Sequence, residues 1–175
     1  LLQYVDTAMV GHLGEQATAA VSVTTTVTWL VNSIPSAISV AVLAMVSKAI
    51  GSHNEELVQR ISKQVLLLVV GCGLITGVVS LALSPYIPIW MGAEEAVQET
   101  ASIYFFIISL PMLFRASSAI FGATIRATQN TRTPMLVSMG ANVVNVILNV
   151  VLIYIWDLGV IGAAIASAIS YTFSG

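Results

Sequence analysis

Long apolar stretches separated by short polar ones run along this chain, and each is long enough to form a membrane helix. Residues 16–47, 64–93 and 133–156 contain no charged side chain. A helix needs about 20 predominantly apolar residues to cross the hydrocarbon core of a bilayer. The pattern therefore predicts six membrane segments, of which the first and last are truncated: residues 1–13, 17–46, 65–83, 101–125, 135–154 and 159–175.

Composition strengthens this prediction. Hydrophobic residues make up 57% of the chain and charged residues only 8%, whereas soluble domains contain about 25% charged residues. We therefore predict an all-α, multi-pass protein of the cell membrane (an inner or plasma membrane), with the lipid bilayer as its surroundings. The chain begins at Leu1 within one apolar stretch and ends at Gly175 within another, so we expect it to be a fragment of a longer protein.

The few charged residues are divided between alternate connections. Two connections carry the basic residues Lys48, Arg60, Lys63, Arg126 and Arg132. The others carry acidic residues and no basic one: Glu15, Glu94, Glu95, Glu99 and Asp157. Basic short loops stay in the cytoplasm, so we predict that the first segment exits outward and that Tyr86, Trp90 and Trp156 lie near the outer interface. The sequence has no basic block of the kind that binds a phosphate backbone, so nucleic acid is not an expected partner.

Polar residues form a narrow stripe along the fifth predicted segment. Ser138, Asn142, Asn145 and Asn149 are spaced four, three and four residues apart. At about 100° per residue these positions share one helix face. Such residues either hydrogen-bond to neighbouring helices or line a polar cavity, and the alignment of three asparagines favours the cavity.

A second polar face lies on the second segment, which contains Pro35 and can kink there. It consists of Thr25, Thr28, Asn32, Ser36 and Ser39. Hydroxyl groups can also bond to their own helix backbone, so a packing face and a pathway remain equally open. On the third segment, Gly73 and Gly77 are four residues apart, which is typical of close helix packing.

Two ionisable residues fall inside predicted membrane segments, Asp6 and Arg115. An ionisable group within the bilayer is by default a candidate functional residue. Asp6 could exchange a proton or hold a cation, although a carboxylate near a helix end could also reach the interface. Arg115 could pair with Asp6, face a water-filled cavity or extend its charge to the membrane surface. We expect Arg115 to have a structural or gating role.

No pattern in the sequence indicates catalysis. His12 and His53 fall in predicted loops, no metal-ligand spacing is present, and no glycine-rich loop precedes a basic phosphate-binding residue. We therefore expect neither an enzyme nor a bound cofactor.

Five motifs together resemble the multidrug and toxic compound extrusion (MATE) family of secondary transporters. Their order and spacing along nearly the whole chain carry the resemblance: "VDTAMVGHLG", "SKAIGSHNEE", "GATIRATQNTRTPM", "NVVNVILN" and "GVIGAAIAS". The resemblance implies that residues 1–175 form the N-terminal six-helix lobe of a protein with twelve helices in two lobes. This lobe would then need the C-terminal lobe as its partner.

The resemblance also implies export of amphipathic, often cationic, small molecules in exchange for H⁺ or Na⁺. Asp6 would be the ion-coupling carboxylate, with Asn145 and Asn149 as its amide partners. Some relatives carry an aspartate at the position of Asn149, and its absence here puts a mechanism with two carboxylates in doubt. The substrate and ion cavity that we predict consists of Asn32, Ser36, Arg115, Ser138, Asn142, Asn145, Asn149 and Ser167.

Two other functions remain open at this point. A lipid-linked oligosaccharide flippase of related architecture would need a basic cavity for pyrophosphate, to which only Arg115 could contribute. A channel or a non-transporting membrane partner would need a polar stripe through the membrane without a titrating carboxylate.

Overall fold

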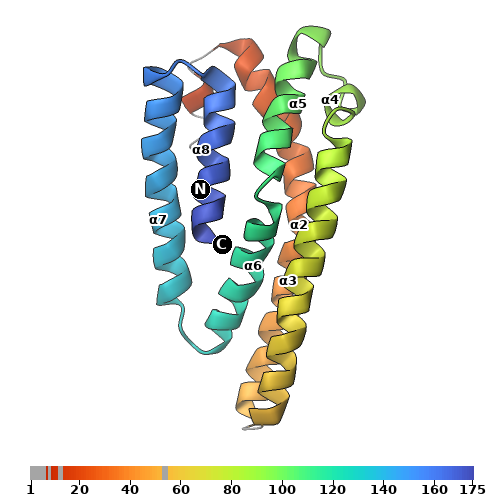
Figure 1. The fold of residues 1–175 in the computed structure, drawn as a ribbon, viewed down its shortest axis with the longest axis vertical. Coiled ribbons are helices and arrows are strands. Elements are labelled where there is room, and N and C mark those ends of the chain that lie inside the picture. Colours follow the sequence, from red (N-terminus) through yellow and green to blue (C-terminus); the bar gives the residue numbers. More distant parts are fainter. Residues whose placement is uncertain (1–6, 8, 12–13, 53–54) are drawn as a thin grey trace.

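The computed structural model describes residues 7, 9–11, 14–52 and 55–175. The described chain is an elongated bundle of helices without strands (Figure 1). Its elements are α2 (Glu15–Gly51), α3 (Glu55–Leu83), α4 (Ile87–Trp90), α5 (Glu95–Ser109), α6 (Met112–Ala127), α7 (Arg132–Asn149), the π-helix η2 (Val150–Ile155) and α8 (Gly159–Ser174). Most of the predicted segment 1–13 lies outside the described residues.

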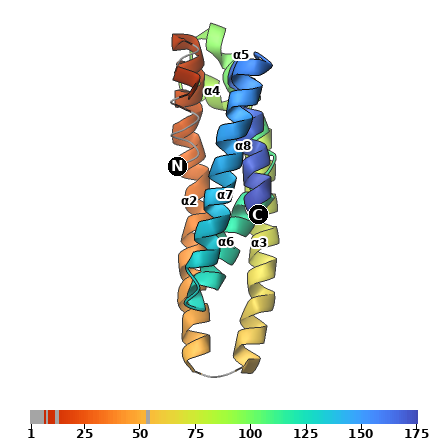
Figure 2. The same cartoon turned by 90° about the vertical axis from the view of Figure 1, so that its left-hand side faces the viewer.

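Helices α2 and α3 form a long hairpin that extends beyond the turn between α6 and α7 (Figure 2). The prediction started the third segment at residue 65, but α3 begins at Glu55. Seven of its first ten residues are polar or charged, so hydropathy alone excluded them. They are nevertheless amphipathic, since Val58, Ile61 and Val65 follow helical spacing and pack with Val42 and other residues of α2.

The predicted fourth segment, residues 101–125, is two helices rather than one. Helix α5 ends at Ser109 and α6 begins at Met112, with a bend of 48° between them. Pro111 causes the break, because it has no N–H to donate and its ring excludes the carbonyl one turn earlier. We expected the interruption at Arg115, which instead lies one turn inside α6.

Helices α3 and α6 approach each other so closely at Gly73 and Gly77 that their backbones are nearly in contact. A Cβ atom added to Gly73 would lie 2.8 Å from Cα of Leu113, and one added to Gly77 would lie 3.4 Å from Cβ of Met112. The two glycines therefore allow this contact, as the spacing predicted.

The second part of the bundle is the pair formed by α7–η2 and α8. A Cβ atom on Gly162 of α8 would lie 2.9 Å from the carbonyl oxygen of Leu152 in η2, so this pair is also closely packed. By contrast, α7 makes far fewer contacts with α6 than with α8. This leaves room between α7 and the hairpin for the cavity described below.

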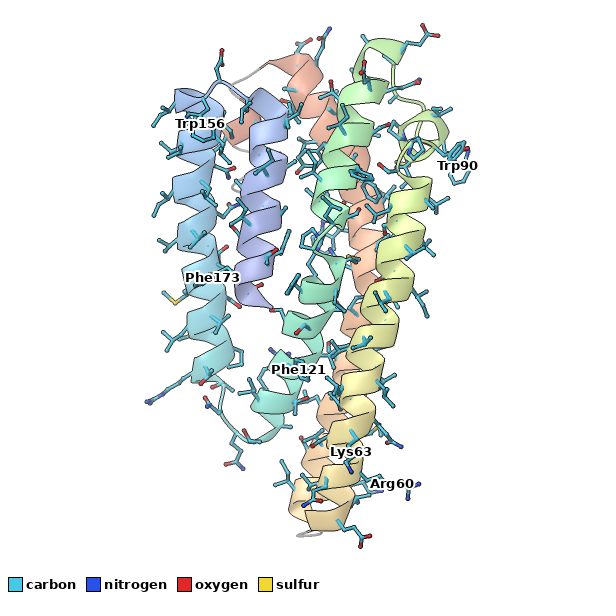
Figure 3. The ribbon with its side chains drawn as sticks, viewed as in Figure 1. Arg60, Lys63, Trp90, Phe121, Trp156 and Phe173 are labelled. Atoms are coloured by element: carbon cyan, nitrogen blue, oxygen red, sulfur yellow. The ribbon has the colours of Figure 1, made fainter. Side chains whose placement is uncertain are left out.

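Two basic side chains and two tryptophans mark the opposite ends of the bundle. Arg60 and Lys63 lie at the end where α2 meets α3, and Trp90 and Trp156 lie toward the opposite end (Figure 3). Within the described part of the chain, three helices are long and apolar enough to cross a membrane, and the bent pair α5 and α6 together makes a fourth candidate. The predicted all-α membrane fold is therefore confirmed. The helix α8, with 16 residues, is a shorter apolar helix.

Candidate binding cavity

A cavity of about 430 Å³ opens between α2, α6, α7 and α8. Five of the predicted site residues line it, from three of these helices: Asn32, Ser36, Arg115, Ser138 and Asn142. The remaining lining residues are Pro35, Ser118, Ala119, Ala141, Tyr171 and Ser174. The structure therefore brings together the polar faces of α2 and α7, which lie about 100 residues apart in the chain.

Most polar side chains in this cavity have no hydrogen-bond partner within the described part of the chain. This holds for Asn32, Ser36, Ser118, Ser138 and Asn142. The amide oxygen of Asn142 is also buried. Polar groups in an apolar bundle cost free energy unless they are solvated or bonded, so these side chains suit a cavity that holds water or a ligand.

Several other hydroxyl groups on α2 behave differently, because they bond to their own helix. On α2, Thr25 donates to the carbonyl oxygen of Val21 at 2.7 Å, and Thr28 donates to that of Thr24 at 2.8 Å. Ser39 likewise donates to the carbonyl oxygen of Ser36. The polar face predicted on the second segment is thus divided: Thr25, Thr28 and Ser39 bond to backbone, whereas Asn32 and Ser36 line the cavity.

Arg115 faces this cavity from α6. Its guanidinium carbon lies 4.3 Å from the centre of the Tyr171 ring, a cation–π distance. Its Nη1 donates a long hydrogen bond, 3.4 Å, to the carbonyl oxygen of Ile108, just before the break at Pro111. Of the positions left open by the sequence, the structure therefore gives Arg115 a place on the cavity wall.

The other half of the amide stripe is packed inside the bundle. Asn145 and Asn149 are both 0% exposed. Asn149 Nδ2 donates to Asn145 Oδ1, and Asn145 Nδ2 donates to Ser167 Oγ on α8, both at 3.2 Å. The structure therefore brings these three predicted site residues together, but none of them lines the cavity. One half of the stripe, Asn145 and Asn149, forms hydrogen bonds inside the bundle, and the other half, Ser138 and Asn142, lines the cavity.

The predicted coupling carboxylate, Asp6, lies outside the described residues. Three polar lining residues are not among those predicted from the sequence: Ser118, Tyr171 and Ser174. Helical spacing could have found them. Ser118 follows Arg115 by three residues, and Tyr171 and Ser174 continue the row that begins at Ser167 in steps of four and three.

The family model described as MatE matches residues 1–151. The chain belongs to the MatE family. The resemblance found in the sequence motifs is thereby confirmed, and with it the prediction of a multi-pass protein of the cell membrane. Membership in a family of transporters also agrees with the prediction that the chain is not an enzyme.

Curated MatE relatives include two proteins described as "Probable multidrug resistance protein NorM". The one from Thermotoga maritima is 30% identical over 173 residues, which cover 94% of this chain and 36% of the relative. The one from Bacillus thuringiensis subsp. konkukian is 29% identical over 174 residues, covering 97% of this chain and 38% of the relative. The chain therefore spans less than half the length of these MatE relatives.

The fold is also similar to that of a solved MATE transporter. The Vibrio cholerae transporter VcmN, in its bent form, superposes with a TM-score of 0.88 at 27% identity. The superposition covers 99% of this chain and 40% of VcmN. The helices of this MatE chain thus correspond to part of a complete transporter.

Proposed function

We propose that this chain is the N-terminal lobe of a cation-coupled antiporter that exports amphipathic, often cationic, small molecules by alternating access. The complete transporter would join this lobe to a C-terminal lobe, as the resemblance implies. The names of the relatives support multidrug export, and the lengths of the relatives leave room for a second lobe.

The observation that carries this proposal is the cavity between α2, α6, α7 and α8. Asn32, Ser36, Ser138 and Asn142 present polar groups, unpartnered within the described chain, inside an otherwise apolar bundle. In a lobe that only packed against a partner, hydrogen bonds between its own helices would pair such polar groups. A transporter instead needs them for successive contacts with substrate and water near the centre of the membrane.

Coupling in this proposal takes place at Asp6. An external H⁺ or Na⁺ neutralises Asp6, weakens the attraction of the lobe for a cationic substrate and favours the conformation that releases it. A ligand shifts such an equilibrium only by its difference in affinity for the two states. Competition between ion and substrate for one carboxylate supplies that difference. Either ion satisfies this scheme.

The proposal is tested by changing Asn142 to leucine in the complete protein. The substitution replaces a cavity amide by an apolar group of larger volume. We expect export driven by an imposed H⁺ or Na⁺ gradient to fall about fivefold or more, the effect of losing one hydrogen bond. Export is measured as efflux of a fluorescent cation from inverted membrane vesicles.

The matched control is Val143→Leu, one residue along α7 at an exposed position outside the cavity. It should express and export like the unchanged protein. Equal export by Asn142→Leu and Val143→Leu would mean that the cavity takes no part in transport. If the unchanged protein exported no substrate under either an H⁺ or a Na⁺ gradient, the antiporter proposal itself would be rejected.

A further inference from the structure

A second hollow, which we call the outer groove, lies between α2, α3 and α4 and has a volume of about 260 Å³. It shares no lining residue with the binding cavity. Leu30 of α2, Val79 of α3 and Trp90 of α4 line it and are exposed, whereas Phe105 of α5 lines it from the buried core. The groove therefore opens on the outside of the described bundle, where a membrane protein meets lipid.

The outer groove lies at the level predicted for the outer interface of the membrane. Trp90 lies toward the end of the bundle opposite Arg60 and Lys63 (Figure 3). Its ring stacks with that of Tyr86, the two centroids being 6.1 Å apart. Aromatic rings with a polar edge are favoured where hydrocarbon meets headgroups. A lipid with its headgroup beside Trp90 would therefore have an acyl chain at the depth of the groove.

The wall of the outer groove is apolar except for Ser80, which suits a hydrocarbon chain with one acceptor group. Ser80 is buried, and its hydroxyl has no hydrogen-bond partner in the described chain. It lies three residues before α3 ends at Leu83, about 4.5 Å along the helix axis. A hydroxyl can turn between staggered positions, so an ester carbonyl of a lipid at this depth would give Ser80 a partner.

The chain beyond the outer groove carries negative charge. Glu94 and Glu95 are exposed and follow Met91, a lining residue, by three and four positions, so about 10 Å of chain separates Met91 from Glu94. Residues 64–114 contain no lysine or arginine. The carboxylates attract an ammonium group and repel a headgroup with net negative charge, so the mouth of the groove favours one class of lipid.

We propose that the outer groove binds a phospholipid of the outer leaflet whose headgroup carries an ammonium group, namely phosphatidylethanolamine. One acyl chain fills the groove, the hydroxyl of Ser80 donates to its ester carbonyl, and the ammonium lies beside Glu94 and Glu95. Within a bilayer, association depends on close packing and polar contacts and not on the hydrophobic effect, and the groove supplies both. The site goes beyond the proposed export function and does not depend on it.

The test compares two lipids that have identical acyl chains and different headgroups. The complete protein, stripped of lipid in detergent, is titrated with dioleoyl phosphatidylethanolamine or dioleoyl phosphatidylglycerol, and the bound lipids are counted by mass spectrometry of the intact complex. We expect one phosphatidylethanolamine to bind about tenfold more tightly than phosphatidylglycerol. Equal affinity for the two lipids, or no bound lipid, would overturn the proposal.

The variant Val79→Trp fills the outer groove from α3 and should abolish this tight binding. Val78→Trp is the matched control, because Val78 is the neighbouring exposed valine and does not line the groove. It should bind phosphatidylethanolamine like the unchanged protein. Retention of the lipid by Val79→Trp would mean that it binds elsewhere on the surface and would overturn the site. A dimer mass that only Val79→Trp abolishes would assign the groove to a second copy of the protein instead.

The headgroup contact is tested by Glu94→Gln combined with Glu95→Gln. This double variant should bind the two lipids within about twofold of each other, because the charge that separates them is gone. Glu56→Gln is the control, since Glu56 is an exposed carboxylate at the other end of α3, and it should keep the tenfold preference. An unchanged preference in the double variant would overturn the headgroup assignment. These exposed positions keep the test decisive even if Val79→Trp does not fold.

Discussion

The variant Asp6→Asn should insert and fold normally but lose ion-driven export. Asparagine keeps the shape and polarity of the side chain but can neither release a proton nor attract a cation by charge. A neutral amide is also less costly to hold in the bilayer than a carboxylate, so stability should not fall. Efflux under an imposed H⁺ or Na⁺ gradient should drop to the level of vesicles without transporter, while the melting temperature stays unchanged.

Glu15→Gln is the control for this experiment, because Glu15 is an exposed carboxylate in the first turn of α2. It should leave export intact. If Asp6 instead formed a structural pair with Arg115, the asparagine variant would leave a buried cation, which typically costs about 3–5 kcal/mol. Melting temperature and export would then fall together. Full export by Asp6→Asn would exclude both roles.

The second large effect expected is on stability, at the contact between α3 and α6. In Gly73→Ala, the new methyl group would lie 2.8 Å from Cα and 2.7 Å from Cδ1 of Leu113. The Cδ1 atom can move aside, but Cα belongs to the backbone, so the two helices must separate. Overpacking of this kind costs about 1–3 kcal/mol. We expect a melting temperature several degrees lower in detergent solution.

Gly71→Ala, two residues earlier on the same helix, provides the control. No atom lies within 4 Å of the position of its added Cβ. Alanine is favoured over glycine in a helix interior by about 1 kcal/mol, so this variant should be as stable as the unchanged protein or slightly more so. A similar melting temperature for both variants would show that α3 and α6 do not depend on the close contact.

Much of the fold could be predicted because membrane helices must be long and apolar. The segments at residues 17–46 and 135–154 differ from α2 and from α7 with η2 by only a few residues at each end. Hydropathy could not reveal the start of α3 at Glu55, since most residues between Glu55 and Gln64 are polar and the helix is held there by Ile61 and Val65, which pack against α2. The break between α5 and α6 was missed because Leu110 and Pro111 lie within one apolar run.

The candidate site was harder to predict, because spacing shows which residues share a face but not what that face meets. Ser138 and Asn142 border the cavity, whereas Asn145 and Asn149, on the same face of α7, pack against Ser167. The difference depends on α8, which covers one part of the stripe and not the other. No property of the asparagines themselves distinguishes the two halves.

Because the hairpin of α2 and α3 is long, a small bend within α2 would displace the far end of the hairpin by a larger distance. Pro35 lines the cavity and removes one backbone hydrogen bond from α2, so the helix is most easily bent beside the proposed ligand. Gly51, at the end of α2, lies about 24 Å further along the helix, and a bend of roughly 10° at Pro35 would displace it by about 4 Å. Val42 and Val46 share a core with Ile61 and Val65, so we expect a bend in α2 to carry α3 with it. A small adjustment around a bound substrate would thus be amplified at the far tip, where a pair of spin labels could record it as a change in distance.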